Sequence, residues 1–525
     1  MSEIRGEETL EHEPETEGRE PDADGRGIPK QLGIGALARD TTIYGGTRVL
    51  LKSLTFFLVP LYAHYLTRDQ MGVLALVLAT AALVDVIISA NLDGVLSRFY
   101  FDRDDEHWRR QVITLYLFIS ATYPAVVIGV LVLLAGQLNN WILAGAGTAI
   151  LFAIALSDLY LTNIVDLSLI LARLRRKPFT FAAYSLTRGV VQVALAILFL
   201  AVFSLGVKGI LLASLIAVCV VFVVSAREYV HDLTRNVTPS VGREMVSFAW
   251  PGVIGGVWFY AINFADRFFV RHYHGLADTG VYDVAYRYAQ IVLLAVVAFR
   301  MGWPQWHYSW LHTDRHPTMV ARGANYYFLA VGFLAVGVAA WILPLLHLLF
   351  RPEWWDASKA VAPLGLAAIA TGAYSVFAVG FMITKRMRIL PGIILAGGLL
   401  ALGLNLLLIP PYSFVGAAWA TAVSFAALAL AVAAVGRRVY PVPWHWWRIG
   451  GAYGLALVLG LASLAVDAWM PMAASLPVRL LIVLAYPLVL WLAGFFPPGD
   501  VAAIRARLRR GSAPPSPPAP AHPGA

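Results

Sequence analysis

The sequence predicts an all-α integral membrane protein with about fourteen transmembrane helices. Hydrophobic residues make up 59% of the chain and charged residues 14%, whereas soluble domains are about 45–50% apolar and about 25% charged. The apolar residues form runs of about 20 positions, the length that crosses a hydrocarbon core about 30 Å thick. Because unpaired backbone amides are costly in lipid, such runs must be helical. Basic residues between the runs alternate from one connection to the next, as membrane topology requires.

Hydropathy places the spans at residues 42–64, 71–97, 111–135, 141–170, 180–204, 208–227, 246–270, 280–302, 323–349, 358–384, 389–409, 415–436, 449–468 and 476–496. The first six form a predicted N-lobe (41–230), the next six a C-lobe (245–437), and two more (447–496) follow the lobes. The acidic segment 1–40 and the segment 500–525, basic and then rich in Pro and Ala, cannot bury a core. Both are predicted to be disordered tails.

Basic residues also assign a side of the membrane to each connection. With the amino terminus in the cytoplasm, each connection on the cytoplasmic side carries at least two basic residues, such as Arg315 and Arg322, and the opposite connections carry about one. Lys and Arg favour the cytoplasmic side, so this pattern predicts an even number of crossings with both termini cytoplasmic. The polar, acidic first forty residues do not resemble a cleavable signal peptide.

The chain contains an internal repeat. The segment HYLTRDQMGV (64–73) matches HYHGLADTGV (272–281) at a shift of 208 positions, which pairs Gly72 with Gly280. A second match, at a shift of 207, pairs Gly209, Ala213 and Ser214 with Gly416, Ala420 and Thr421. Two copies of a six-helix unit would enter the membrane in the same sense, because six is even. Parallel repeats of this kind enclose a cavity in transporters that rock between inward and outward openings.

The connections offer no catalytic machinery. The sequence lacks the phosphate-binding loop G-x-x-x-x-G-K-[ST], so we expect no ATP hydrolysis, and no connection exceeds about 25 residues. His307, His312 and His316 share one connection without a cysteine or an acidic residue at ligand spacing, which favours a solvated loop over a metal site. Cys219 is the only cysteine, so no disulfide or thiolate metal site is expected. We predict a transporter without cofactor, metal or nucleic-acid partner, and not an enzyme.

Charged residues inside the spans are functional candidates, because charges are costly in a membrane. Arg48 and Lys52 are four positions apart and share one face of a helix, as do Asp283 and Arg287. Lys52 lies at a depth similar to that of Asp85 on the next span, which indicates a structural ion pair within the N-lobe. Asp283 and Arg287 are predicted to pair along their own helix.

Arg48 and Arg188 have no evident partner at their depth, which makes them the better candidates for holding an anion. A guanidinium group binds phosphate oxygens with two parallel hydrogen bonds and stays charged at any relevant pH. The predicted substrate-binding residues are Arg48, Lys52, Arg188 and Arg287, and packing between helices is the alternative role. Asp85 and Asp283 are predicted either to couple an ion or to form structural pairs.

Asp266 and Arg267 are consecutive residues near the end of the seventh span. Neighbouring side chains on a helix diverge by about 100°, so the two are not expected to form a simple salt bridge on one face. We expect one of them to reach water and the other to face the lobe interior. Their predicted role is structural, at the helix end, with no part in transport.

The segment FAWPGVIGGVWFYAINFADRFFVRHYHGLADTGVYDVAYRYA (248–289) resembles the polysaccharide flippase families of the multidrug/oligosaccharidyl-lipid/polysaccharide exporter superfamily. The shared features are Pro251, the Asp266-Arg267 pair, and Gly280 with Tyr282 at the opening of the next span. Residues 56–79 and 382–425, the latter with Asn405 and a following Gly-Ala-Ala-x-Ala-Thr, agree as well. With the six, six and two grouping of helices, the resemblance covers most of residues 40–440.

The resemblance implies a MATE-like flippase of the bacterial inner membrane. Such a protein moves undecaprenyl-pyrophosphate-linked oligosaccharides from the cytoplasmic to the outer leaflet for lipopolysaccharide and other polysaccharide biosynthesis. Its implied partners are this lipid-linked oligosaccharide, membrane lipids, and the polymerase and glycosyltransferases of the pathway. An ion-coupled multidrug cation antiporter of the same fold is the main alternative, in which Asp85, Asp158 and Asp283 would serve. A membrane-embedded glycosyltransferase or polymerase is less favoured because the outer loops are short.

Overall fold

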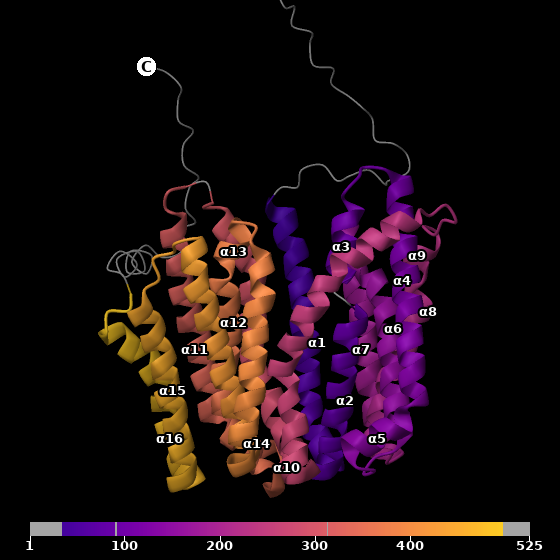
Figure 1. Cartoon of the computed structure of the whole chain (residues 1–525). Coiled ribbons are helices and arrows are strands. Elements are labelled where there is room, and N and C mark those ends of the chain that lie inside the picture. The colour runs from indigo at the N-terminus through magenta and orange to yellow at the C-terminus, as the bar shows by residue number, and fades with distance from the viewer. Residues whose placement is uncertain (1–33, 90–91, 312, 497–525) are drawn as a thin grey trace, which may run out of the picture.

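The computed structural model describes residues 34–89, 92–311 and 313–496, and within these residues it contains helices and no β-strand (Figure 1). The predicted tails therefore lie outside the described residues, apart from the start of the first helix. Some side chains of that helix are not described either, among them those of Arg48 and Lys52. The predicted all-α class is confirmed.

The first half of the chain forms one bundle, drawn in indigo and purple at the right of Figure 1. Its elements are α1 (Ile34–Tyr65), α2 (Arg68–Ser89), α3 (Leu92–Tyr100), α4 (Glu106–Leu133), α5 (Ala135–Leu143), α6 (Ala149–Leu174), α7 (Pro178–Ile197), the π-helical turn η1 (Leu198–Val202), α8 (Gly206–Ser225) and α9 (Arg227–Val230). Helix α6 packs against α4 and α8, and α7 packs against α1 and α8.

The second half forms a bundle beside the first, coloured from rose through orange to yellow in Figure 1, where α11 to α16 lie at the left and α10 lies toward the middle. Its elements are α10 (Pro239–Tyr308), α11 (His316–Leu349), the 3-10 turn η2 (Pro352–Ala357), α12 (Ser358–Phe377), α13 (Val379–Ile383), the 3-10 turn η3 (Met387–Ile389), α14 (Leu390–Val439), α15 (Trp446–Trp469) and α16 (Met472–Leu492). Helix α10 packs against α14 in this bundle and against α2 in the other, so it lies between the two.

Eleven helical segments among the described residues are long and apolar enough to cross a membrane. Two of them, α10 and α14, are interrupted once, at Gly275 (φ 87°) and at Ser413 (φ 49°). Tyr282 donates a hydrogen bond to Asp266, sixteen residues earlier, whereas a continuous helix would separate them by about 24 Å. The chain therefore reverses at Gly275, as predicted between the seventh and eighth spans. If the two halves of α10 and of α14 are counted as separate spans and α1 is added to the eleven segments, the total for the described residues is fourteen helical segments, consistent with the predicted fourteen spans.

The predicted start of the fourth span, at residue 141, is wrong by eight residues, because α6 begins at Ala149. The apolar residues before it belong to the short helix α5, which ends at Leu143 and is followed by Ala144 in a left-handed conformation (φ 48°). Gly145 follows with φ 78°, a conformation that glycine adopts without steric cost. Two consecutive left-handed residues separate α5 from the span, so hydropathy alone counts the two helices as one.

The two bundles touch where α2 crosses the second half of α10. A methyl group added at Gly72 would overlap the backbone oxygen of Leu276, and one added at Gly280 would overlap that of Arg68. The two glycines are the positions that the internal repeat pairs at a shift of 208, and Arg68 and Leu276 have the same separation. The crossing is therefore built from equivalent positions of the two halves, and its backbone contact requires residues without a side chain.

Helices α15 and α16 are held to the second bundle by buried polar contacts. Arg479 on α16 is 1% exposed and donates to the backbone oxygen of Ala340 on α11 at 2.7 Å. Its guanidinium also pairs with Asp467 on α15 at 2.7 Å. Tyr486 donates to the backbone oxygen of Phe328 at 3.0 Å, and its hydroxyl oxygen occupies the space that a side chain at Gly332 would need. These contacts connect three helices away from the cavity between the bundles.

Candidate functional site: a charged cavity between the bundles

Three adjoining cavities of about 280, 360 and 200 Å³ lie among α1, α2, α6, α7, α8 and α10. The cavities adjoin one another, because Arg287 lines the first and second, Arg188 the second and third, and Leu78 all three. The polar side chains in this space are Asp85, Asp158, Thr162, Ser185, Arg188, Gln192, Ser214, Arg267, Asp283, Arg287 and Gln290, with the hydroxyls of Tyr62 and Tyr286. Both bundles contribute to the lining.

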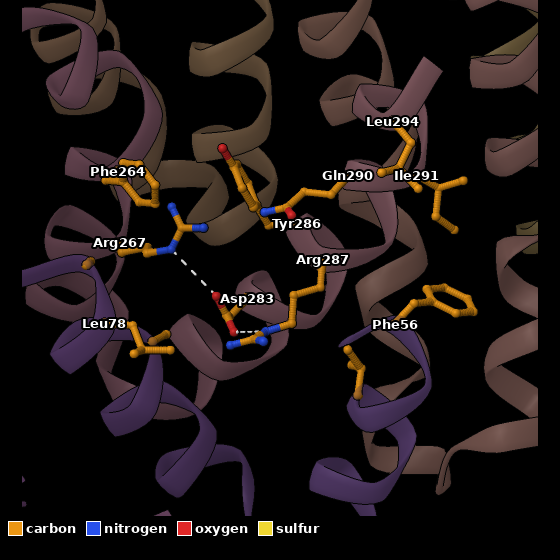
Figure 2. Close-up of a pocket in the computed structure, with 13 residues that line it drawn as sticks. Phe56, Leu78, Phe264, Arg267, Asp283, Tyr286, Arg287, Gln290, Ile291 and Leu294 are labelled. Carbon is orange, nitrogen blue, oxygen red and sulfur yellow. Dashed lines mark hydrogen bonds and ion pairs between the residues drawn. The ribbon is translucent and has the colours of Figure 1, made fainter. Parts of the chain in front are cut away.

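Asp283 lies between two arginine side chains in the first cavity, as Figure 2 shows. Its Oδ2 is 2.5 Å from Nε of Arg287, one helical turn later, and its Oδ1 is 3.7 Å from Nε of Arg267. The predicted pairing of Asp283 with Arg287 is therefore present, and Arg267 adds a second partner from the preceding half of α10. The two terminal nitrogens of Arg287 have no hydrogen-bond partner among the described residues.

Arg267 is fixed from several sides. Its Nη1 donates to the backbone oxygen of Asn263 at 3.0 Å and to Asp266 at 3.2 Å. The guanidinium also lies over the Tyr286 ring, 4.2 Å from its centre, and 5.0 Å from the centre of the Phe264 ring. Cation–π contacts of this kind are stronger where water is excluded. The side chain is thus held in place while it lines the cavity.

The expected divergence of Asp266 and Arg267 is wrong, because the two side chains form an ion pair at 3.2 Å and neither reaches water. The reversal at Gly275 explains the difference, since it brings Tyr282 against Asp266 from the other half of α10. Thr421 on α14 donates to the same carboxylate at 3.2 Å. Asp266, which is 1% exposed, thus connects both halves of α10 to α14 through its hydrogen bonds with Tyr282 and Thr421. Arg267 instead lines the cavity.

Arg188 is not without a partner, contrary to the expectation from depth. Its Nη2 donates to Thr162 at 2.8 Å and lies 3.9 Å from Asp158, both on the neighbouring helix α6. Ser214 on α8 donates to the other oxygen of Asp158 at 3.0 Å. The expectation failed because the depth of Arg188 along its own helix does not show which residues of α6 face it. Asp85 lines the same cavity and also has an interaction partner.

Each arginine that the structure describes in this cavity therefore has a carboxylate within 4 Å. Arg188 has Asp158, Arg287 has Asp283, and Arg267 has Asp283 together with Asp266. The predicted Lys52–Asp85 pair lies outside the described side chains, as does the predicted role of Arg48. The cavity is accordingly a paired arrangement of both signs, and an incoming anion must compete with internal carboxylates for the guanidinium groups.

The expected solvated loop around the histidines is wrong for the two of them that the structure describes. His307 is 0% exposed and His316 is 1% exposed. His307 lies in the last turn of α10 against Trp303, and Nδ1 of His316 is 2.7 Å from the hydroxyl of Tyr440. His312 lies outside the described residues. No group of three metal-ligating side chains occurs among the residues that the structure describes.

The sequence profile of a family described as polysaccharide biosynthesis protein matches residues 37–302, just over half of the chain. The chain belongs to this family. No curated protein matches it in sequence. The matched region includes all the charged residues that line the three cavities, among them Arg188, Arg267 and Asp283.

Solved structures of two kinds of membrane protein have a similar fold. The lipid II flippase MurJ in an inward closed conformation gives a TM-score of 0.61 at 13% identity, covering 85% of this chain and 100% of that one. An inward-facing multidrug resistance MATE family transporter of the MOP superfamily gives 0.60 at 11% identity, covering 77% and 95%. A MOP superfamily transporter from Pyrococcus furiosus gives 0.51 at 13% identity, covering 80% and 96%.

At these identities the structural similarity establishes the fold. Together with the family match it confirms the predicted resemblance to the exporter superfamily and the MATE-like architecture. The protein is a multi-pass membrane protein of a polysaccharide biosynthesis family, and it has the fold of known flippases and transporters.

Proposed function

We propose that this protein flips undecaprenyl-pyrophosphate-linked oligosaccharides from the cytoplasmic to the outer leaflet of the bacterial inner membrane. The observation that carries the proposal is the cavity between the bundles, lined by Arg188 from one bundle and by Arg267 and Arg287 from the other. Guanidinium groups from two sides suit a diphosphate, which presents oxygens on both of its phosphorus atoms. The proposal places both chain termini in the cytoplasm.

The shape of the cavity supports the same substrate. Its volume of several hundred cubic ångströms, with Gln192 and Gln290 beside the arginines, provides space and hydrogen-bonding groups for sugar residues. Apolar residues such as Leu78 and Phe56 also line the cavity. The lipid chain remains in the bilayer, and the two bundles alternate access to the cavity by rocking about their crossing. MurJ, one of the proteins with a similar fold, is named as a flippase of lipid II.

The test is a flipping assay with the purified protein in liposomes that contain a fluorescent undecaprenyl-pyrophosphate-linked oligosaccharide. We expect the double variant Arg188→Gln with Arg287→Gln to lose flipping while it remains folded, because each bundle loses one arginine of the cavity. The matched control is Arg110→Gln, which removes an arginine that also pairs with a carboxylate four residues away, but outside the cavity. Flipping by the double variant at the rate of this control would contradict the proposal.

A cation antiporter is the second candidate, because carboxylates also line the cavity. Asp85 and Asp158 lie together in the 200 Å³ part of the space. Such a protein would protect a host that lacks its own exporters against cationic drugs. Strong drug resistance without export of lipid-linked sugar would favour this candidate, whereas accumulation of lipid-linked oligosaccharide in a deletion strain would favour the flippase.

A further inference from the structure

We infer that Asp283 is an exchangeable counter-ion, whose carboxylate is replaced by the substrate's diphosphate between Arg267 and Arg287. The inference rests on the proposed function, since it describes how the same cavity takes up an anionic lipid. It assigns Asp283 a role in substrate selection, beyond an ion pair that stabilises the fold.

The position of Asp283 is that of an anion bound by two cations. One carboxylate oxygen faces Arg267 and the other faces Arg287, and all three side chains line the first cavity (Figure 2). A diphosphate bridging the same two guanidinium groups would make contacts of the same kind with more oxygens. Charge-assisted, bidentate hydrogen bonds are the strongest that such groups form.

Asp283 has fewer hydrogen-bond donors around its carboxylate than Asp266 has. Asp266 accepts hydrogen bonds from Tyr282, Thr421 and the backbone nitrogen of Arg267, and it does not line the cavity. Asp283 has only its two arginine partners among the described residues, and the contact to Arg267 is longer than a hydrogen bond, at 3.7 Å. An anion entering the cavity therefore meets Asp283 and leaves Asp266 in place.

Arg267 and Arg287 differ in the contacts that they keep when Asp283 leaves. Arg267 remains fixed by Asp266, Asn263 and the Tyr286 ring when Asp283 leaves. Arg287 has Asp283 as its one charged partner among the described residues, and it borders both the first and the second cavity. Release of Asp283 thus frees Arg287 to bind the diphosphate or to turn toward Arg188 across the second cavity.

An anion must first displace the Asp283 carboxylate from Arg267 and Arg287. The cavity therefore binds anions more weakly than it would without Asp283, by the free energy of these two contacts. A ligand that makes fewer contacts than the carboxylate cannot displace it, whereas a diphosphate can. The released carboxylate needs water or a cation as its new partner, because an unpaired charge is costly in this environment. Substrate binding and the state of Asp283 are consequently coupled, and coupling free energies are reciprocal between the two events.

The experiment compares the binding of undecaprenyl diphosphate with that of undecaprenol, by microscale thermophoresis in nanodiscs, to the wild-type protein and to Asp283→Asn. We expect the variant to bind the diphosphate roughly tenfold more tightly, a value within the usual range of coupling between sites. Binding of undecaprenol should not change. Unchanged or weaker diphosphate binding by a folded Asp283→Asn protein would overturn the inference.

The matched control is Asp266→Asn, which removes a carboxylate that is also adjacent to Arg267 but outside the cavity. Equal tightening by both variants would overturn the inference, because it would show a general effect of charge. If Asp283→Asn alone does not fold, the comparison is repeated in an Arg267→Gln background, where the Asn variant must again bind more tightly than its parent. Wild-type protein that binds diphosphate and undecaprenol equally would refute the proposed function itself.

Discussion

Replacing Gly280 by alanine tests whether the backbone contact between α2 and α10 holds the two bundles together at that end. The added methyl carbon would overlap the backbone oxygen of Arg68 and lie 3.0 Å from the backbone nitrogen of Gly72. Overpacking of this kind costs about 1–3 kcal/mol, whereas alanine stabilises a helix relative to glycine by roughly 0.5–1 kcal/mol. The difference between the two effects is a net cost of up to about 2.5 kcal/mol for the state with the crossing closed.

A net cost of about 1–2 kcal/mol, in the middle of this range, changes a population ratio by about 5- to 30-fold, in favour of a state in which the crossing is open. The assay is double electron–electron resonance with spin labels at Tyr65→Cys and Tyr273→Cys, in a Cys219→Ser background. These two tyrosines are related by the repeat, lie close to the crossing in sequence, and are 44% and 42% exposed. We expect Gly280→Ala to increase the share of long distances between the labels.

The control is Gly255→Ala in the half of α10 that precedes Gly275, where an added methyl group would contact no neighbouring helix within 4 Å. This variant gains the same helix propensity without the steric overlap, and its distance distribution should equal that of the wild type. If Gly280→Ala and Gly255→Ala give the same distributions and the same melting temperature, the close crossing does not hold the bundles together, and the reasoning is wrong.

Three further outcomes follow from the packing and the site. Arg479→Met should destabilise the protein by about 3–5 kcal/mol in detergent thermal unfolding, because it leaves Asp467 buried without its partner; a change below about 1 kcal/mol would contradict this. Gly332→Ala should lower the melting temperature through overlap with the Tyr486 hydroxyl, and Tyr486→Phe should restore much of the loss in a double-variant cycle. Arg188→Lys should reduce flipping in liposomes although it keeps the charge, since lysine lacks the planar group that contacts Thr162 and Asp158; full activity would contradict a role for the guanidinium geometry.

The fold class could be predicted from the sequence because the bilayer restricts the solutions to a few. Segments of about 20 apolar residues must be helices in lipid, so hydropathy alone identifies most of the spans. The prediction was wrong where apolar residues form a short helix outside a span, as in α5, since composition does not record the left-handed residues Ala144 and Gly145 that separate it from α6.

The site was harder to predict, because it depends on which helices face each other. The pairing of Asp283 with Arg287 follows from their spacing on one helix, and the structure has it. The partners of Arg188 come from α6, and those of Asp266 come from α14 and from the far side of the reversal at Gly275. Arg267 was predicted to have a structural role, and its position in the sequence does not show that it also lines the cavity. One signal was available, since an arginine inside a span must face a cavity or a partner.

The pairing of every described cavity arginine with a carboxylate has a consequence for the membrane in which the protein works. A chamber lined with unpaired guanidinium groups would attract chloride and inorganic phosphate whenever it stood empty, and each cycle without cargo would leak them. If the two bundles alternate access as we propose, the internal pairing of each described arginine weakens that attraction, and the protein can then change state without cargo and without dissipating ion gradients.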